Sequence, residues 1–356
     1  MTQRAKPRIL FVSESVTLAH FARPFELSNN LPEDDYEIHF ACANIYQKFL
    51  ANAKHTLHTI YSIPAEQFKQ ALASGNPLYN YSTLKKYVEE DLELIAKVKP
   101  DLIVGDFRIS LAVSARLAKI PYATISNAYW SPYAPKQYPT PCLPMTKYLG
   151  VNIGGFLFSL AAPIAFKVHA LAMQRLKKHF GLPKMELELR QVYTEADYTL
   201  YADIPSLFPL NNPPDNHFFI GPVLWSPVVT EPDWWDQLPA DRPIIYVSMG
   251  SSGSNSTLQK VVNAFANERV TVIASVAGEK VSLPSVSNIF TADYIDGMAA
   301  AKRADLVICN GGSLSCQQAF AHGKPVLGIA SNMDQFLNMA AVSRANAGLV
   351  LRADNI

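Results

Sequence analysis

Short apolar runs recur along the chain, and the stretches between them carry apolar residues at the spacing of amphipathic helices. Four runs in the first part have the length of strands that are buried on both faces of a sheet: 8–13, 36–42, 100–106 and 121–126. Helical spacing follows at 20–31 and 111–119. Strands that alternate with helices in this way predict right-handed β-α-β units and a parallel sheet.

A second series of the same kind begins after a change in composition. Between Gly221 and Pro243 prolines are frequent and no periodicity is visible, which is typical of a linker. Beyond it the pattern predicts strands at 244–248, 270–275, 288–290, 306–309 and 326–329, and helices at 257–266, 296–302 and 315–322.

We therefore predict an α/β protein with two doubly wound parallel-sheet domains. The N-terminal domain covers 1–222, the linker 223–242 and the C-terminal domain 243–356. Binding sites of such folds lie at the carboxyl ends of the strands, so we expect a site in a cleft that the two domains face.

The composition excludes several classes of protein. The chain has 356 residues with 31 Lys+Arg against 30 Asp+Glu, and this balance gives no support for nucleic-acid binding. A hydrophobic share of 49% excludes a disordered chain. The 4 cysteines form no C-x-x-C pair, so neither a disulfide scaffold nor a zinc site is expected. The apolar run Ile9–Val12 is too short for a signal peptide, and we expect a soluble cytoplasmic protein.

Motifs of several common enzyme classes are absent from the sequence. No G-x-G-x-x-G follows a strand, and neither a Walker A loop nor H-E-x-x-H occurs. Gly311–Ser315 begins like the nucleophile elbow of hydrolases but ends in Ser where that turn needs Gly. These absences disfavour dehydrogenases, kinases and hydrolases.

The segment 306–322 reads as a strand, a turn with two glycines and a helix. Such a turn puts backbone N–H groups and a helix N-terminus at the carboxyl end of a strand, where they bind phosphate. Ser313 and Ser315 would add hydroxyl donors. By itself, the same pattern also describes an ordinary turn between a strand and a helix.

With the residues that follow it, this segment resembles the donor signature of the bacterial family 1 (UDP-glycosyltransferase-like) branch of the GT-B glycosyltransferases. That signature reads roughly H-G-G-x-x-S/T-x-x-E-A, then G-x-P, then D/E-Q-x-x-N. Its counterparts here are Asn310-Gly311-Gly312, Ser315, Gln318-Ala319, Gly323-Lys-Pro325, and Asp334-Gln335 with Asn338. The stretch that contains Tyr294 and Ile295 looks like the family segment beside the nucleotide base, and Gly250-Ser251 is similar to the loop after the first C-terminal strand.

The resemblance implies a GT-B fold of two Rossmann-like domains and a hexose transfer that inverts the anomeric carbon. The donor would be a UDP- or dTDP-sugar, and the acceptor a hydroxyl of a hydrophobic small molecule or lipid. The backbone of Asn310–Ser315, including Ser313, and the Gly250-Ser251 loop would meet the diphosphate without a metal or cofactor. Asp334 and Gln335 would hold sugar hydroxyls, although Asp-Gln is also a good helix start.

The resemblance also assigns a catalytic pair in the N-terminal half. His20 follows the first strand, as the family's catalytic base does, and Asp106 ends the predicted strand 100–106, where the family's orienting aspartate lies. A neutral imidazole can take the proton of an acceptor hydroxyl, and a buried carboxylate fixes its tautomer. Without the resemblance, His20 would more simply be a histidine at a helix N-terminus.

Two substitutions depart from the family pattern. Asn310 replaces the usual histidine beside the diphosphate, a loss of about 1–2 kcal/mol of binding. Gln318 replaces the glutamate that accepts the ribose hydroxyls, which leaves both UDP- and dTDP-sugars open. The family's final helices would follow Ile356, and whether the sequence is shortened or naturally short stays open.

These departures keep other hypotheses open. One is a degenerate, non-catalytic GT-B protein that binds nucleotide or partners a true transferase. Another is a GT-B nucleotide-sugar epimerase, which agrees less well with Asp334-Gln335 and His20.

A charge asymmetry concerns the acceptor. No Asp or Glu occurs from Phe107 to Met185, and Tyr148–Phe166 is uncharged and apolar, although Gly150 and Pro163 argue against a transmembrane helix. Either this stretch forms the wall of an acceptor pocket followed by a solvated basic helix, or 148–184 lies on the inner surface of an anionic membrane. Three residues after a strand end are candidates for the acceptor pocket or for the core: Asn127, Tyr129 and Trp130.

Overall fold

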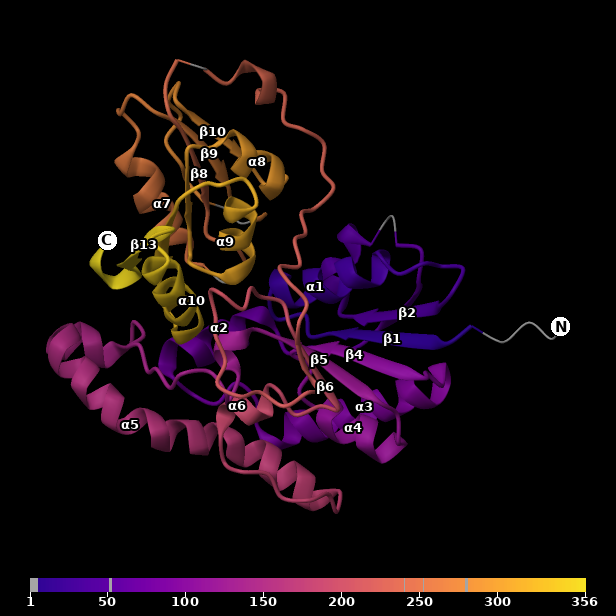
Figure 1. Cartoon of the computed structure of the whole chain (residues 1–356). Helices are drawn as coiled ribbons and strands as arrows, with labels where there is room; N and C mark the ends of the chain where they lie inside the picture. Colours follow the sequence, from indigo (N-terminus) through magenta and orange to yellow (C-terminus); the bar gives the residue numbers. More distant parts are fainter. Residues whose placement is uncertain (1–5, 51–52, 240, 252, 279–280) are drawn as a thin grey trace. The chain divides into compact units, whose positions relative to one another are not determined.

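The computed structural model describes residues 6–50, 53–239, 241–251, 253–278 and 281–356. It contains two sheets whose paired strands are all parallel, and the contacts divide the chain into two compact units (Figure 1). The first unit comprises the chain up to Lys136 together with Leu160–Val223, and the second comprises Gln137–Ser159 and Leu224–Ile356. The α/β class with two parallel sheets is as predicted.

The first unit is built on a seven-stranded sheet in the order β3-β2-β1-β4-β5-β6-β7. Its strands are β1 (Arg8–Ser13), β2 (Glu37–Cys42), β3 (Thr56–Thr59), β4 (Leu102–Asp106), β5 (Tyr122–Ser126), β6 (Tyr198–Tyr201) and β7 (His217–Phe219). Its helices are α1 (Leu18–Asn29), α2 (Ala65–Ser74), α3 (Tyr81–Val98), α4 (Leu111–Ala118), α6 (Leu189–Val192) and the second part of α5 (Pro144–His179).

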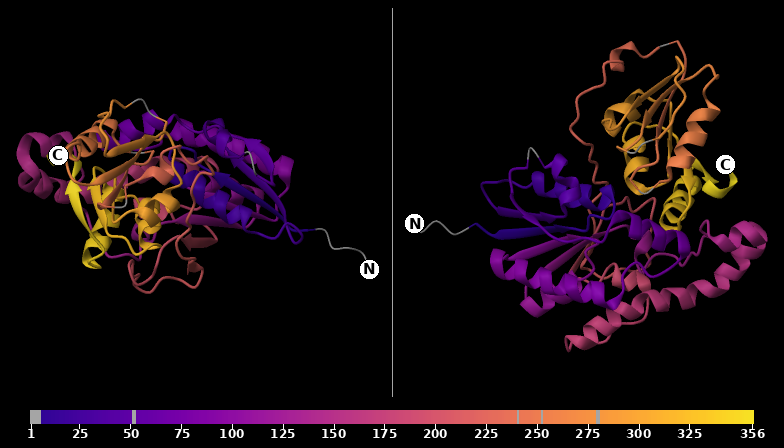
Figure 2. Two further views of the ribbon diagram at one scale, coloured as in Figure 1. Left: turned by 90° about the horizontal axis from the view of Figure 1, so that it is seen from above. Right: turned by 180° about the vertical axis from the view of Figure 1, so that it is seen from behind.

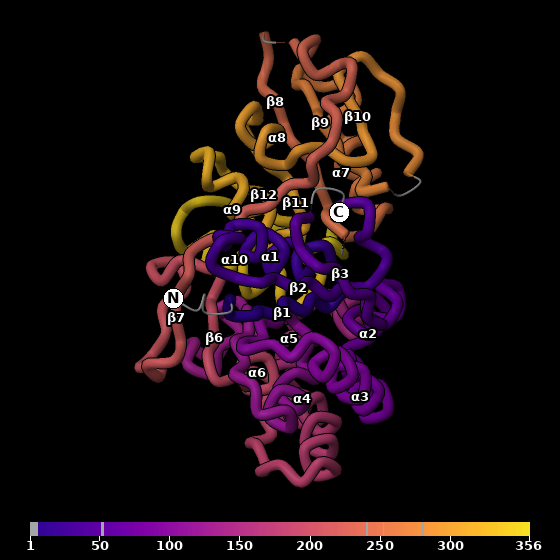
Figure 3. The backbone as a smooth tube through the Cα atoms, turned by 90° about the vertical axis from the view of Figure 1, so that its right-hand side faces the viewer, coloured from indigo at the N-terminus to yellow at the C-terminus, as the bar shows by residue number. Residues whose placement is uncertain are grey.

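Helices cover both faces of this sheet, which explains why its strands are continuous apolar runs. Leu10 and Val12 of β1 share a core cluster with residues of α3 and α4 on one face. On the other face, Phe21 and Phe25 of α1 pack against Phe40 of β2. Figure 3 shows β1, β2 and β3 side by side, as their parallel pairing requires.

The second unit has a six-stranded sheet in the order β10-β9-β8-β11-β12-β13. Its strands are β8 (Ile244–Ser248), β9 (Thr271–Ser275), β10 (Ile289–Ala292), β11 (Leu306–Cys309), β12 (Val326–Ala330) and β13 (Gly348–Arg352). Its helices are α7 (Asn255–Ala264), α8 (Gly297–Arg303), α9 (Ser313–Phe320) and α10 (Met333–Arg344).

Side chains of the second sheet alternate between two cores. Figure 2 shows helices on both faces of this sheet. Tyr246 packs in the cluster that contains residues of α8, α9 and α10, whereas Ile245 and Val247 pack in the cluster that contains residues of α7. The predicted strand 306–309 has the same bounds in the structure, and the predicted helix 315–322 begins two residues earlier, at Ser313.

Two features differ from the expected organisation. Residues 137–159 group with the second unit, whereas the predicted N-terminal domain over 1–222 included them. This segment passes into α5, whose backbone leaves helical geometry at Gly150, where φ is 75°. That left-handed φ suits glycine, because it has no Cβ to clash with the backbone.

Candidate active site

The topology of the first sheet brings His20 and Asp106 together. β1 and β4 are neighbours with Ser13 opposite Asp106, so their carboxyl ends meet at one edge. α1 starts shortly after β1 and carries His20 in its first turn. His20 Nδ1 lies 2.8 Å from Asp106 Oδ1, the Asp106 side chain is fully buried, and the His20 side chain is 18% exposed. When Nδ1–H donates to this carboxylate, Nε2 is left as the basic nitrogen.

Arg23, one turn further along α1, is a member of the site that the sequence analysis missed. Its Nε donates to Asp106 Oδ2 at 2.7 Å and its Nη2 to Asp106 Oδ1 at 2.9 Å. Burial acts to lower the pKa of the guanidinium, but the charge of Asp106 outweighs it and holds that pKa above its ordinary value. A fork of this kind fixes the plane of the carboxylate that His20 contacts. The sequence did contain a signal for Arg23, because a residue three positions after His20 lies on the same face of a helix.

The network continues to Asn127 and Asp203. Arg23 Nη1 donates to Asn127 Oδ1 at 2.7 Å, and Asn127 Nδ2 donates to Asp203 Oδ2 at 3.2 Å. The three residues Asp106, Asn127 and Asp203 stand at the ends of the neighbouring strands β4, β5 and β6. Asn127, an acceptor candidate, is therefore a buried member of a polar network, and its acceptor role stays a prediction.

Aromatic side chains pack around His20. The ring of Phe107 stacks on the imidazole with centroids 4.3 Å apart and planes 9° from parallel. Phe107 has a φ of 59°, an unusual conformation for a residue with a Cβ. Of the two aromatic acceptor candidates, Tyr129 packs against Phe208 at 5.2 Å and Trp130 against Tyr193 at 5.3 Å. Both have aromatic neighbours, and Trp130 is half-buried whereas Tyr129 is buried.

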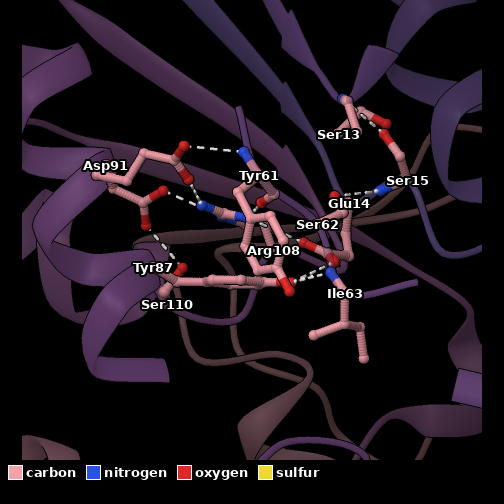
Figure 4. A network of polar contacts seen from close by, with 12 residues as sticks. Ser13, Glu14, Ser15, Tyr61, Ser62, Ile63, Tyr87, Asp91, Arg108 and Ser110 are labelled. Atoms are coloured by element: carbon pink, nitrogen blue, oxygen red, sulfur yellow. Dashed lines mark hydrogen bonds and ion pairs between the residues drawn. The ribbon is translucent and has the colours of Figure 1, made fainter. Parts of the chain in front are cut away.

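A second charged network holds the loop between β1 and α1 (Figure 4). Arg108 Nη1 donates to Glu14 Oε2 at 3.2 Å and Arg108 Nε to Asp91 Oδ1 at 3.0 Å. Tyr87 donates from its hydroxyl to Glu14 Oε1 at 2.9 Å. Burial raises the pKa of Glu14 to about 7, although Arg108 acts to lower it. Because Glu14 directly follows β1, this network anchors the loop that leads to His20.

In the second unit, two loops that the sequence assigns to the donor are close neighbours. β8 and β11 pair with Ser248 opposite Cys309, so the loops after both strands leave the same edge of the sheet. A Cβ at Gly250 would lie 3.5 Å from Asn310 Nδ2, which shows how near the loops are. Gly311 has a φ of 80°, and a Cβ there would lie 2.7 Å from Met339 Cγ. Only glycine suits that position.

The turn leaves the N-terminus of α9 without a side-chain cap among the described residues. The N-cap is Gly312, whereas α10 is capped by Asn332 and α8 by Asp296. The first N–H groups of a helix have no partner within the helix, so an uncapped start suits an anion. Asn310 Oδ1 accepts from the Gly312 N–H at 3.0 Å and so supports the turn. Ser313 is buried and Ser315 half-buried beside it, and Ser251 follows Gly250 in the facing loop.

The remaining donor candidates have structural partners of their own. Gln318 Nε2 donates to the Trp225 carbonyl at 2.8 Å and to Ser226 Oγ at 3.1 Å. The Tyr294 hydroxyl donates to the Ala277 carbonyl at 2.9 Å. The side chain of Ile295 is buried in the core, so only its backbone is left for a ligand.

Asp334 and Gln335 lie in the first turn of α10. Gln335 Oε1 accepts from the Ser331 N–H at 2.8 Å and from the Asn332 N–H at 3.3 Å, and Asn332 Oδ1 accepts from the Gln335 N–H at 3.1 Å. The helix-start interpretation of this pair is thus observed as a capping box. Gln335 Nε2 is buried and has no hydrogen-bond partner among the described residues, which leaves a donor for a ligand. Among all the residues that the structure describes, no group of three or more His, Cys, Asp or Glu side chains is placed to hold a metal ion.

The chain is similar in sequence to known glycosyltransferases. Residues 244–356 match the glycosyltransferase family 28 C-terminal domain. The chain is 47% identical over 351 residues to a PGL/p-HBAD biosynthesis glycosyltransferase of Mycobacterium tuberculosis, covering 99% of this chain and 82% of that protein. It is 48% identical over 349 residues to a PGL/p-HBAD biosynthesis rhamnosyltransferase of Mycobacterium bovis, covering 98% and 78%.

A further relative is named inactive, and a solved structure shares the fold. The inactive PGL/p-HBAD biosynthesis glycosyltransferase of Mycobacterium bovis is 46% identical over 259 residues, covering 73% of this chain and 71% of that protein. The spinosyn rhamnosyltransferase SpnG complexed with thymidine diphosphate superposes with a TM-score of 0.66 at 17% identity, covering 98% of this chain and 88% of that one. At that identity the likeness concerns the fold alone.

Proposed function

Because this chain belongs to the GT-B glycosyltransferases of the UDP-glycosyltransferase-like family, we propose that it transfers a hexose from a nucleoside-diphosphate sugar to a hydroxyl of a hydrophobic or lipid-like acceptor. The observation that carries the proposal is the His20–Asp106 pair at 2.8 Å, in a chain whose relatives transfer sugars. The pair supplies what the reaction needs most, a base for a weakly acidic hydroxyl.

In the proposed reaction, His20 Nε2 takes the proton of the acceptor hydroxyl as its oxygen attacks the anomeric carbon. The bond from that carbon to the diphosphate breaks on the opposite side, so the anomeric configuration inverts. Asp106 accepts from Nδ1–H and stabilises the imidazolium. Arg23 acts through Asp106 and is a positioning residue.

We further propose that the diphosphate binds at the uncapped start of α9. Main-chain N–H groups there and the helix dipole would stabilise the charge of the departing nucleoside diphosphate without a metal or cofactor. Gln335 Nε2, a buried donor without a partner in the described chain, supports a role in holding the sugar. The donor is a UDP- or dTDP-sugar, and the relatives named rhamnosyltransferases make dTDP-sugars the first to test.

The test compares binding with turnover. Calorimetry with UDP and dTDP gives the nucleotide affinity, and a panel of UDP- and dTDP-sugars with long-chain alcohols as acceptors gives the transfer rate. We expect His20→Ala to lose roughly 10²-fold or more of the rate with unchanged nucleotide affinity. His179→Ala, at an exposed histidine at the end of α5, is the matched control and should keep full activity. Full activity of His20→Ala would overturn the assignment of the base.

One observation favours a second candidate, a non-catalytic nucleotide-binding protein. A relative of 46% identity is named inactive, and this chain has Asn310 and Gln318 where the family has histidine and glutamate. In the structure, the Gln318 amide is held by Trp225 and Ser226. Nucleotide binding without transfer or donor hydrolysis for any sugar, unchanged in His20→Ala, would establish this second function.

A further inference from the structure

The outer face of α5 is apolar and exposed over much of its length. On the part of α5 within the first unit, this outer face consists of Leu160, Ile164, Lys167, Val168, Leu171, Arg175 and Lys178. Leu160 is 61% exposed and Ile164 66% exposed, and Phe156 on the preceding turn is 64% exposed. Large apolar side chains gathered on one exposed face mark an interaction surface rather than ordinary protein surface.

The opposite side of the same helix is part of the core. Ala162, Phe166, Ala170, Met173 and Leu176 recur at helical spacing and are all buried. The last three share a cluster with Val16, Phe68 and Leu84 of the first unit. Among the described residues, α5 is the helix whose length and composition would allow it to cross a membrane. Its core contacts instead hold it against the folded unit, so it can lie along a membrane but not across one.

The charges on the outer face are all of one sign. Along the helix, the outer face changes from apolar residues at Leu160 and Ile164 to cationic residues at Arg175 and Lys178. The sequence has no acidic residue from Phe107 to Met185, and the three exposed cations of the face form no ion pair with a described residue. An apolar stripe with adjoining cations is the pattern of helices that lie in the interface of anionic bilayers.

We propose that the outer face of α5 docks on an anionic lipid bilayer. The apolar side chains enter the boundary between headgroups and acyl chains, and Lys167, Arg175 and Lys178 meet lipid phosphates. A second copy of the chain matches the face less well, because it would oppose cations to cations. A small acceptor does not match it either, because the exposed side of a helix encloses nothing. The surface rests on α5 itself, and only its use in reaching a lipid-like acceptor rests on the proposed function.

Vesicle co-sedimentation tests the surface directly. We expect the protein to pellet with vesicles of phosphatidylcholine and phosphatidylglycerol, to stay in solution with phosphatidylcholine alone, and to be released by high salt. The double variant Leu160→Ser with Ile164→Ser should lose roughly tenfold or more of its partition coefficient, because two apolar side chains no longer leave water. The matched control is Val228→Ser with Leu349→Ser, at positions 88% and 72% exposed, and it should bind as the parent protein does.

Charge and self-association are tested in parallel. Lys167→Gln with Arg175→Gln should weaken binding to anionic vesicles and reduce its dependence on salt. Equal binding by the parent protein and the Leu160/Ile164 variant would overturn the proposal. So would gel filtration that shows a dimer dissociated by that variant, without loss of vesicle binding. Circular dichroism followed through thermal unfolding checks that the first unit, which carries these substitutions, is folded in every variant.

A water-soluble acceptor separates the two proposals. If transfer to it persists but no vesicle binding is found, the membrane surface is wrong and the proposed function stands. If vesicle binding is found but no sugar is transferred, the surface stands and the proposed function is wrong.

Discussion

Arg23 shows how a single side chain fixes the geometry of the candidate site. It makes two hydrogen bonds to Asp106 and one to Asn127, and its side chain is 6% exposed. A buried carboxylate that keeps only His20 as a partner would be poorly oriented and partly uncompensated. The ion pair therefore both orients Asp106 and compensates its buried charge.

Replacing Arg23 with methionine tests this positioning role. We expect Arg23→Met to lower the free energy of unfolding of the first unit by about 3 kcal/mol or more, because a buried charge loses its partner. At a temperature where the variant is folded, transfer should lose kcat rather than raise KM, because the base is misaligned while binding is kept. Arg23→Lys keeps the charge but not the fork, and should recover stability better than kcat. Full kcat in Arg23→Met would refute the role.

Glu14 gives the first unit a pH-dependent stability. Its pKa is raised to about 7 by burial, from the ordinary value of 4.5. Between these values the folded protein binds more protons than the unfolded chain, so stability is complete below the lower value and falls as the pH rises through the higher one. The slope approaches about 1.4 kcal/mol per pH unit for one proton.

Glu14→Gln removes the titrating group and keeps the shape of the side chain. Urea unfolding at about pH 5 and about pH 7 should show the parent protein losing stability relative to the variant as the pH rises. Parallel stabilities of the two proteins over this range would show that Glu14 titrates as an ordinary carboxyl group.

At the scale of elements, the turn between β11 and α9 requires glycine at position 311 for two reasons. Gly311 needs a positive φ, and a Cβ there would collide with Met339 of α10. Gly323 also has a positive φ of 65°, but a Cβ there would meet nothing within 4 Å. A substitution at Gly323 therefore measures the backbone strain alone, whereas one at Gly311 measures the strain together with the collision.

Gly311→Ala and Gly323→Ala form a matched pair. Both should lose about 1 kcal/mol of stability through the left-handed backbone, and Gly311→Ala should lose more because the helix packing must shift. Only Gly311→Ala should weaken dTDP or UDP binding in calorimetry, because only that turn is proposed to hold the diphosphate. Equal nucleotide affinities would place the diphosphate elsewhere.

The elements that the sequence predicted are those whose signal is local. Strands such as 306–309 are buried on both faces and read as continuous apolar runs, and α9 is preceded by a glycine turn. β3, β6 and β7, together with α2 and α3, were not predicted. β3 and β7 are edge strands of four and three residues, too short to show a pattern.

Contacts across the fold were the other part that the sequence could not supply. His20 and Asp106 were paired by resemblance, and the strand order brings them to one edge. Arg23 and Asp203 have no such motif, and their places depend on the order of β4, β5 and β6. Gln335 was assigned to the sugar with a helix start as the alternative, but its partners Ser331 and Asn332 in the capping box are residues that no donor signature marks.

At the scale of the whole molecule, each unit has core clusters of its own. The clusters of the first unit contain residues such as Leu10 and Leu84, and those of the second contain Val247 and Val307. Two compact units with separate cores can unfold in separate steps. The proposed nucleotide site belongs to the second unit alone. A bound nucleotide should therefore stabilise that unit and leave the first unit unchanged.

We therefore expect dTDP or UDP to raise only the unfolding transition of the second unit. A ligand at 100 times its Kd stabilises the state that binds it by about 2.7 kcal/mol. Hydrogen exchange followed by mass spectrometry should show new protection at 250–251 and 310–315 on nucleotide addition, and unchanged exchange in α1. His20→Ala should give the same map, because its role is proposed for transfer and not for nucleotide binding. Protection that appears in α1 and not in the turn before α9 would move the diphosphate to the first unit and reverse the assignment of donor and acceptor.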